Sequence, residues 1–170
     1  MPEEYLDIVS EEGHIVGSAS RSEVHARGLL HRVVHLLVFD LQGRLLLQKR
    51  APSKDIAPCK WDTSVGGHVE LGENIPQALR REMKEELSLE NCPVNFLYSY
   101  VHRDREENEL VYSFRCVYDG PVIPNPHEIE EVRFWSLPEI GRTMDSGIFT
   151  ENFRDEFTRY LQAAGGDQGV

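Results

Sequence analysis

Apolar runs separated by turn-forming residues predict a chain rich in short strands. They cover residues 5–9, 14–18, 31–39, 45–49, 61–69, 94–102, 110–118 and 131–135. The first two predict an N-terminal hairpin over 5–18, and the next two predict a second hairpin around Asp40 and Gly43. Residues 51–60 contain two prolines and are expected to form a loop. Neighbouring hairpins mixed with helices indicate an α/β or α+β class with a mixed sheet.

Helical signals are clearest over residues 75–87. Asn74 is a favourable N-cap, Gln77 stands three residues later in the capping-box position, and Pro76 falls in the first turn, where its missing N–H is harmless. Weaker signals predict a short helix after Leu137-Pro138 and a C-terminal helix over about 151–161.

A helical wheel divides the central helix into two faces. One narrow stripe is apolar and is expected to pack on the sheet: Leu79, Met83 and Leu87. The adjoining arc carries three carboxylates: Glu82, Glu85 and Glu86. Like charges one turn apart repel each other, and such an arc is usually a solvated acidic face. It is alternatively a site for a hard cation, which removes the repulsion and completes its octahedron with water.

Composition limits the classes of function. A chain of 170 residues with 40% hydrophobic and 28% charged residues predicts one globular domain over 1–170. The formal net charge of −11 disfavours a nucleic-acid polymer as partner, whereas small phosphorylated substrates remain accessible through bridging divalent cations. The longest apolar run, 33–39, is too short for a bilayer, and the acidic N-terminus does not resemble a signal peptide. The three cysteines form no zinc or disulfide pattern. We therefore expect a cytoplasmic protein without a membrane partner.

Spacing around the three glutamates favours the cation site. Gly67 is followed after five residues by Glu73, and Arg81-Glu82 follows after seven more. With Glu85-Glu86 and the apolar Leu89, this segment resembles the signature of the Nudix hydrolases, over about residues 67–89. At roughly 7% usage per fixed position, only a few chains per million match by chance. Ser88 replaces the signature's last glycine, which leaves the turn after the helix in question.

This resemblance implies an α/β/α sandwich with a mixed sheet that hydrolyses diphosphates linked to another moiety, using Mg²⁺ or Mn²⁺. It implies metal ligation by Glu82, Glu85 and Glu86, with Glu82 or Glu85 as general base and a backbone carbonyl from Gly66 as a further ligand. It also implies structural roles for Gly67, Glu73 and Arg81. Many members of the family are homodimers, which makes a homodimer a possible state of this chain.

A second segment resembles isopentenyl-diphosphate isomerase, a member of the same superfamily. Arg50 and Lys54 match residues that hold the substrate diphosphate in that family. Five further residues resemble its metal ligands and predict a second metal site: His25, His31, His68, Glu107 and Glu109. Histidine ligands predict weaker binding there below about pH 6.5, whereas an all-oxygen site on the helix should lose metal only near pH 4.

Two departures favour hydrolysis over isomerisation. The isomerase needs a cysteine where this chain has Gly66, and it lacks the glutamates at positions 82 and 85. We therefore predict metal-dependent hydrolysis of a nucleotide-type or prenyl-type diphosphate. The alternatives are an isomerase that works without the cysteine and a catalytically silent binding module of the same fold.

Overall fold

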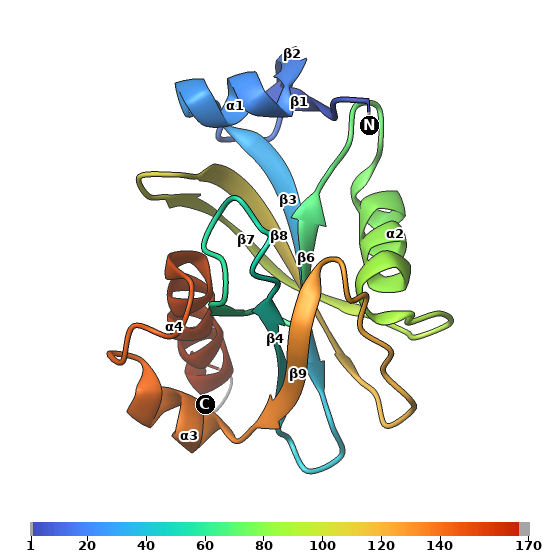
Figure 1. The fold of residues 1–170 in the computed structure, drawn as a ribbon, viewed down its shortest axis with the longest axis vertical. Coiled ribbons are helices and arrows are strands. Elements are labelled where there is room, and N and C mark those ends of the chain that lie inside the picture. The colour runs from blue at the N-terminus through green and yellow to red at the C-terminus, as the bar shows by residue number, and fades with distance from the viewer. Residues whose placement is uncertain (1, 167–170) are drawn as a thin grey trace.

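The computed structural model describes residues 2–166 and is organised around one long strand, β3 (Figure 1). The strands are β1 Tyr5–Val9, β2 Ile15–Ser20, β3 His31–Phe39, β4 Leu45–Arg50, β5 Trp61–Asp62, β6 Val65–His68, β7 Asn95–Arg103, β8 Asn108–Val117 and β9 Ile129–Trp135. The helices are α1 Arg21–Arg27, α2 Ile75–Leu87, α3 Leu137–Thr143 and α4 Glu151–Gly166. Residues 1 and 167–170 of the predicted domain lie outside the described part.

Strand β3 joins the parts of the sheet. It pairs in parallel with β8 along its whole length and antiparallel with β6. The predicted hairpin around Asp40 and Gly43 forms, but its strands β3 and β4 pair only at Phe39 and Leu45 and then diverge. Strand β4 pairs instead with β9 and β5. These partners lie far from β4 in the sequence, so the local hydrophobic pattern could not predict this pairing.

The predicted strand 61–69 is two strands, interrupted at Thr63-Ser64. The hydroxyl of Ser64 accepts a hydrogen bond from the backbone N of Val38 at 2.9 Å and donates to the carbonyl of Leu46. This buried side chain therefore joins β3 and β4 where they diverge. Helix α1 was not predicted; Ser20 caps its N-terminus and Gly28, with φ 61°, ends it.

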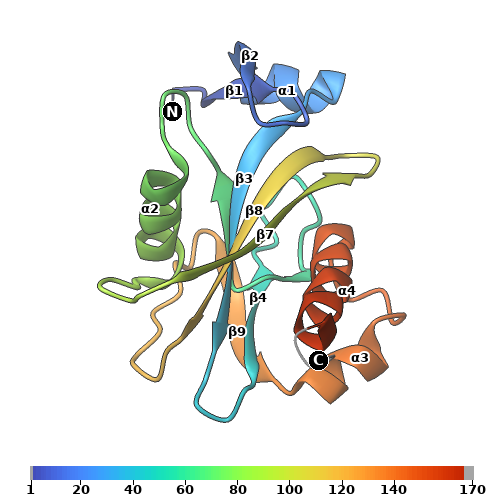
Figure 2. The same ribbon diagram turned by 180° about the vertical axis from the view of Figure 1, so that it is seen from behind.

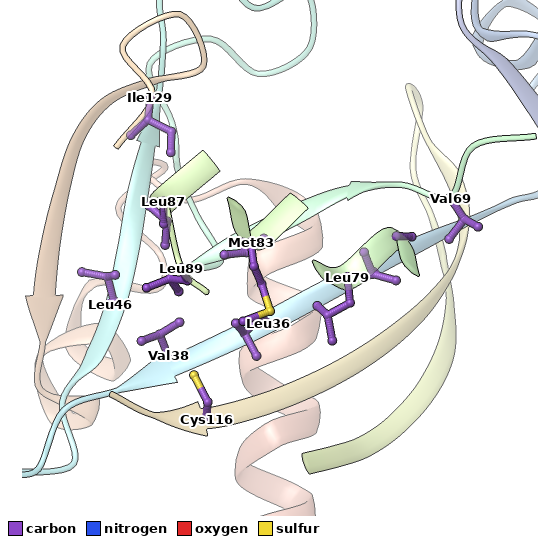
Figure 3. Close-up of a cluster of buried hydrophobic side chains, with 13 residues drawn as sticks. Leu36, Val38, Leu46, Val69, Leu79, Met83, Leu87, Leu89, Cys116 and Ile129 are labelled. Carbon is purple, nitrogen blue, oxygen red and sulfur yellow. The ribbon is translucent and has the colours of Figure 1, made fainter. Parts of the chain in front are cut away.

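Alternate residues of β3 face opposite layers. Val34, Leu36 and Val38 join the core beneath α2, which Figure 3 shows around Met83. Leu37 and Phe39 join the aromatic core beneath α4, on the other side of the sheet (Figure 2). The predicted α/β/α sandwich is confirmed.

Helix α2 has its predicted boundaries. Asn74 and Gln77 form the predicted capping box, with each side chain accepting from the other residue's backbone N–H. At the C-terminus, Ser88 adopts the left-handed conformation with φ 56°, which glycine normally supplies. The turn is thus retained with serine. Among the helices of residues 2–166, none has both the length and the apolar composition needed for a membrane span.

We predict that Ser88→Gly stabilises the fold. Glycine removes the steric cost of the left-handed conformation, so the free energy of unfolding should rise by about 1 kcal/mol in urea denaturation. Ser88→Ala is the matched control: it loses the weak hydroxyl contact with the Ile123 carbonyl but keeps the strain, and should not be more stable than the wild type. A destabilised glycine variant would contradict the steric account.

Candidate active site

The glutamate face of α2 is directed at strand β6 rather than at solvent. Packing of Leu79, Met83 and Leu87 on the sheet fixes the rotation of the helix. Glu86 is 7% exposed, and the Glu82 side chain is 12% exposed. The Glu85 side chain, at 56%, stays in solvent. The solvated acidic face considered from the sequence is therefore wrong for two of the three carboxylates.

Close backbone approach at β6 makes this burial possible. The backbone N of Gly66 donates to Glu86 Oε1 at 2.8 Å, and Gln48 Nε2 donates to Glu86 Oε2 at 3.1 Å. A Cβ on Gly67 would lie 2.1 Å from the carboxyl carbon of Glu82. Any side chain at position 67 would therefore displace Glu82.

Arg81 connects the loop before α2 with the glutamates. Its Nε and Nη2 atoms donate to the two carboxylate oxygens of Glu73 at 2.8 and 2.9 Å. Nη2 also donates to the carbonyl of His68 at 2.8 Å. Nη1 donates to Glu82 at 2.7 Å and to Glu85 at 3.2 Å. One guanidinium thus holds the loop, β6 and the acidic arc in one arrangement.

Burial makes the two inner glutamates unusually basic. It raises the pKa of Glu82 to about 7, although Arg81 opposes the shift. Burial, with the charge of Glu82 beside it, raises the pKa of Glu86 to about 8. These carboxyls therefore hold protons near neutral pH unless another cation is present. A bound cation would favour the ionised forms of both carboxyls, so the pair is suited to a cation site.

The three glutamates line a cavity of about 410 Å³, here called the outer cavity, and cationic side chains line it as well. Arg50 donates to Asp62 Oδ2 at 3.3 Å and to the carbonyl of Ile56, and Lys54 pairs with Glu128. Arg21, from the unpredicted helix α1, also lines this cavity and forms two hydrogen bonds with Asp55 at 2.8 and 3.0 Å. These three cations thus line the same cavity as the three glutamates.

Three of the five residues expected to form a second metal site come together at the edge of the outer cavity. One ligand atom from each of His25, His31 and His68 lies within 4.8 Å of the other two. His31 Nδ1 donates to the Leu29 carbonyl at 2.9 Å, which leaves Nε2 with its lone pair. Within residues 2–166, His25 Nε2 and His31 Nε2 are buried without a hydrogen-bond partner. This is a favourable arrangement for a cation.

The other two expected ligands lie differently. Glu109 Oε1 is 3.8 Å from His31 Nε2, while its other oxygen accepts from Asn152. Glu107 groups instead with His102 and Asp104, which sequence analysis did not identify. The ring nitrogens of His102 face Asp155 and Asp104 at 3.0 and 2.9 Å. Burial raises the pKa of both Glu107 and Glu109.

The shifted pKa values favour the opposite pH order for the two metal sites. Burial lowers the pKa of His25 and of His31 to about 4, so these rings stay neutral well below pH 6.5. The pKa values of Glu82 and Glu86, about 7 and 8, make protons compete for the helix site near neutrality instead. Ordinary pKa values fail here because both groups are desolvated.

Arg21 had a signal in the sequence. Ser20 and Glu23 have the spacing of a capping box, which indicates that a helix begins at residue 21. Gln48, which holds Glu86, had none, because its role depends on pairing between distant strands.

We predict that the free energy of unfolding of the metal-free protein falls between pH 5 and pH 8. Glu86 holds its proton up to about pH 8 when folded and to about pH 4.5 when unfolded, so the unfolded chain binds fewer protons across this range. Denaturation in a chelator should show a fall on the order of 2 kcal/mol, smaller in Glu86→Gln. The exposed Glu90→Gln is the control. Parallel curves for the wild type and Glu86→Gln would contradict the assigned pKa.

Comparison with known proteins agrees with this geometry. The NUDIX domain model matches residues 29–157. An uncharacterized Nudix hydrolase of Yersinia pestis is 38% identical over 138 residues, which cover 80% of this chain and 74% of the relative. A Photorhabdus laumondii protein named isopentenyl-diphosphate Delta-isomerase 2 is 33% identical over 160 residues, 89% of each chain.

The fold has a similar counterpart among solved structures. A crystal structure of a Deinococcus radiodurans protein superposes with a TM-score of 0.82 at 27% identity, covering 92% of this chain and 98% of the other. The matched domain model includes the glutamate helix and the strands that bury it. The chain belongs to the Nudix hydrolase family and is a pyrophosphohydrolase.

Proposed function

We propose that this pyrophosphohydrolase cleaves a diphosphate linkage in a small phosphorylated substrate, with divalent cations held by Glu82, Glu85 and Glu86. The observation that carries this is the pair of buried, high-pKa carboxylates that line the outer cavity together with Arg21, Arg50 and Lys54. Carboxylate oxygens and cationic side chains are complementary to a metal-bound diphosphate. Mg²⁺ and Mn²⁺ are the cations that suit oxygen ligands.

The arrangement of the ligand oxygens favours a bound cation at this position. Glu82 and Glu86 repel each other when both are ionised, and Arg81 Nη1 contacts Glu82 but not Glu86 among the described hydrogen bonds. The N–H of Gly66 faces Glu86; since the N–H and C=O of one strand residue point to the same side, we propose its carbonyl as a further ligand. When bound, the cations supply neutralisation of phosphate charge and a more acidic water.

The chain's own residues have separate parts in this proposal. Glu82 or Glu85 is the general base that takes a proton from the attacking water. Arg50 and Lys54 hold the diphosphate, exchanging their contacts with Asp62 and Glu128 for phosphate oxygens. The ion pair between Arg81 and Glu73 holds the loop before α2 against the helix.

The isomerase-like residues support a second, histidine-rich metal position in the same protein. His25 and His31 provide unpaired Nε2 atoms, and His68 lies beside them, with its Nδ1 3.3 Å from Glu4. Isomerisation itself is not supported, because Gly66 offers no side chain to move a proton. A Cβ there would also lie 3.2 Å from the His35 ring.

We predict that Glu82→Gln and Glu86→Gln each lower kcat by at least about 10²-fold, because a ligand or base is lost. Phosphate release from a panel of nucleotide and prenyl diphosphates with Mg²⁺ or Mn²⁺ measures this. Glu90→Gln, an exposed glutamate just beyond the helix, should behave as the wild type. Near wild-type rates in both variants would contradict the proposed function.

We predict that Arg50→Ala or Lys54→Ala raises KM by about tenfold or more, the loss expected for a charge-assisted contact to phosphate. Lys49→Ala is the matched control, because Lys49 pairs with Glu130 and is not among the residues that line the outer cavity. Steady-state kinetics on every accepted substrate provide the test. An unchanged KM throughout would make both residues ordinary surface charges.

We predict a second Mn²⁺ position among His25, His31 and His68. Anomalous diffraction from Mn²⁺-soaked crystals should show a peak there in addition to the helix site, since imidazole nitrogens suit Mn²⁺ better than Mg²⁺. His31→Gln should remove this peak and leave the other. With the helix site fully occupied, the absence of a peak among the histidines would leave them with a structural role.

A further inference from the structure

A second cavity lies directly behind the proposed diphosphate site. It measures about 130 Å³ and is here called the inner cavity. Arg50, Gly66, Gly67, His68 and Glu107 line both cavities, so the two share a wall. The two cavities are therefore adjacent, and we infer that a group attached to a diphosphate in the outer cavity extends past Gly66 into the inner one. This step rests on the proposed function.

The inner cavity has a polar lining despite its depth. Its buried or half-buried polar side chains include His35, Asp62, Glu107, Glu109, Thr150 and Asn152. Apolar side chains also line the cavity: Val33, Ile56 and Ala57. These polar groups can exchange hydrogen bonds with the hydroxyl or amino groups of a polar ligand, whereas a hydrocarbon offers them no partner.

The buried His35 lines the inner cavity, and the carboxylate of Glu156 lies beside its ring. Its Nδ1 is 3.5 Å from Oε1 of the fully buried Glu156 in α4. Glu156 is itself fixed by the hydroxyls of Ser113 at 2.7 Å and Tyr98 at 2.8 Å. The opposite edge of the imidazole, with Nε2, faces Gly66, where the missing side chain leaves it open to the cavity. The imidazole thus offers a polar edge to the inner cavity.

We propose that the inner cavity binds the non-phosphate part of the substrate and selects a small group with hydroxyl or amino donors over a hydrocarbon chain, with His35 as a specificity-determining residue. A hydrocarbon would desolvate the polar groups of the lining without pairing them, which is unfavourable at each one. The volume equals the share of about four water molecules in the liquid, which suits a compact group.

A pair of substrates with equal carbon number tests this selection. Ribose 5-diphosphate carries hydroxyls, whereas isopentenyl diphosphate carries a five-carbon hydrocarbon. Because sites built for hydrogen bonding reject analogues that lack the group, kcat/KM should be at least about 10²-fold higher for the ribose compound. A nucleotide sugar and a nucleoside triphosphate in the same assay report general diphosphate cleavage.

His35→Leu makes this part of the cavity lining apolar and should reduce this ratio by about tenfold or more, while His35→Gln, which keeps a polar tip, should retain more of it. The exposed His14→Leu is the matched control and should leave the ratio unchanged. Thermal melts report whether each variant folds. The comparison of substrates on the unaltered protein remains decisive if a variant does not.

The possible results distinguish a failure of this inference from a failure of the proposed function. Equal or better cleavage of isopentenyl diphosphate, or its conversion to the dimethylallyl isomer, would overturn the selection while diphosphate chemistry remains. A wild-type ratio in folded His35→Leu would overturn the role of His35. Cleavage of none of the four compounds would contradict the proposed function and the inference together.

Discussion

Burial of two like-charged carboxylates against a glycine strand is the constraint on which this structure depends. Glu82 and Glu86 reach β6 only because Gly67 has no side chain and Gly66 directs its N–H at Glu86. Arg81 offsets the charge of Glu82 and ties it to the loop that enters the helix. The remaining repulsion and desolvation appear as raised pKa values, and a divalent cation is the species that relieves both.

Strand β3 contributes side chains to both faces of the sheet. The residues on its α2 face set the rotation of the glutamate helix through Leu36 and its neighbours. On its α4 face, His35 lies among apolar residues of the same strand, with its Nδ1 3.5 Å from Glu156. The two faces meet at β6, where Gly66 separates the diphosphate site from the inner cavity. One pair of strands therefore supports both the proposed chemistry and the proposed selection.

Local signals in the sequence were sufficient for α2 and most strands, since caps, turns and apolar periodicity act over a few residues. The glutamate spacing was sufficient for the family. Pairing of β4 with β9, the short helix α1 that brings Arg21 to the cavity, and the support of Glu86 by Gln48 depend on contacts between distant segments. The pKa values of His25 and Glu86 departed from expectation for the same reason, because desolvation is a property of the folded surroundings.

The central claim is that the buried glutamates of α2 bind a divalent cation. Isothermal titration of Mn²⁺ into metal-free protein, compared between wild type, Glu82→Gln, Glu86→Gln and the His31→Gln control, tests it most directly. The account predicts that either glutamine variant loses most of the affinity of one site, while His31→Gln retains that site. Equal Mn²⁺ affinity and stoichiometry in the wild type and both glutamine variants would contradict the account.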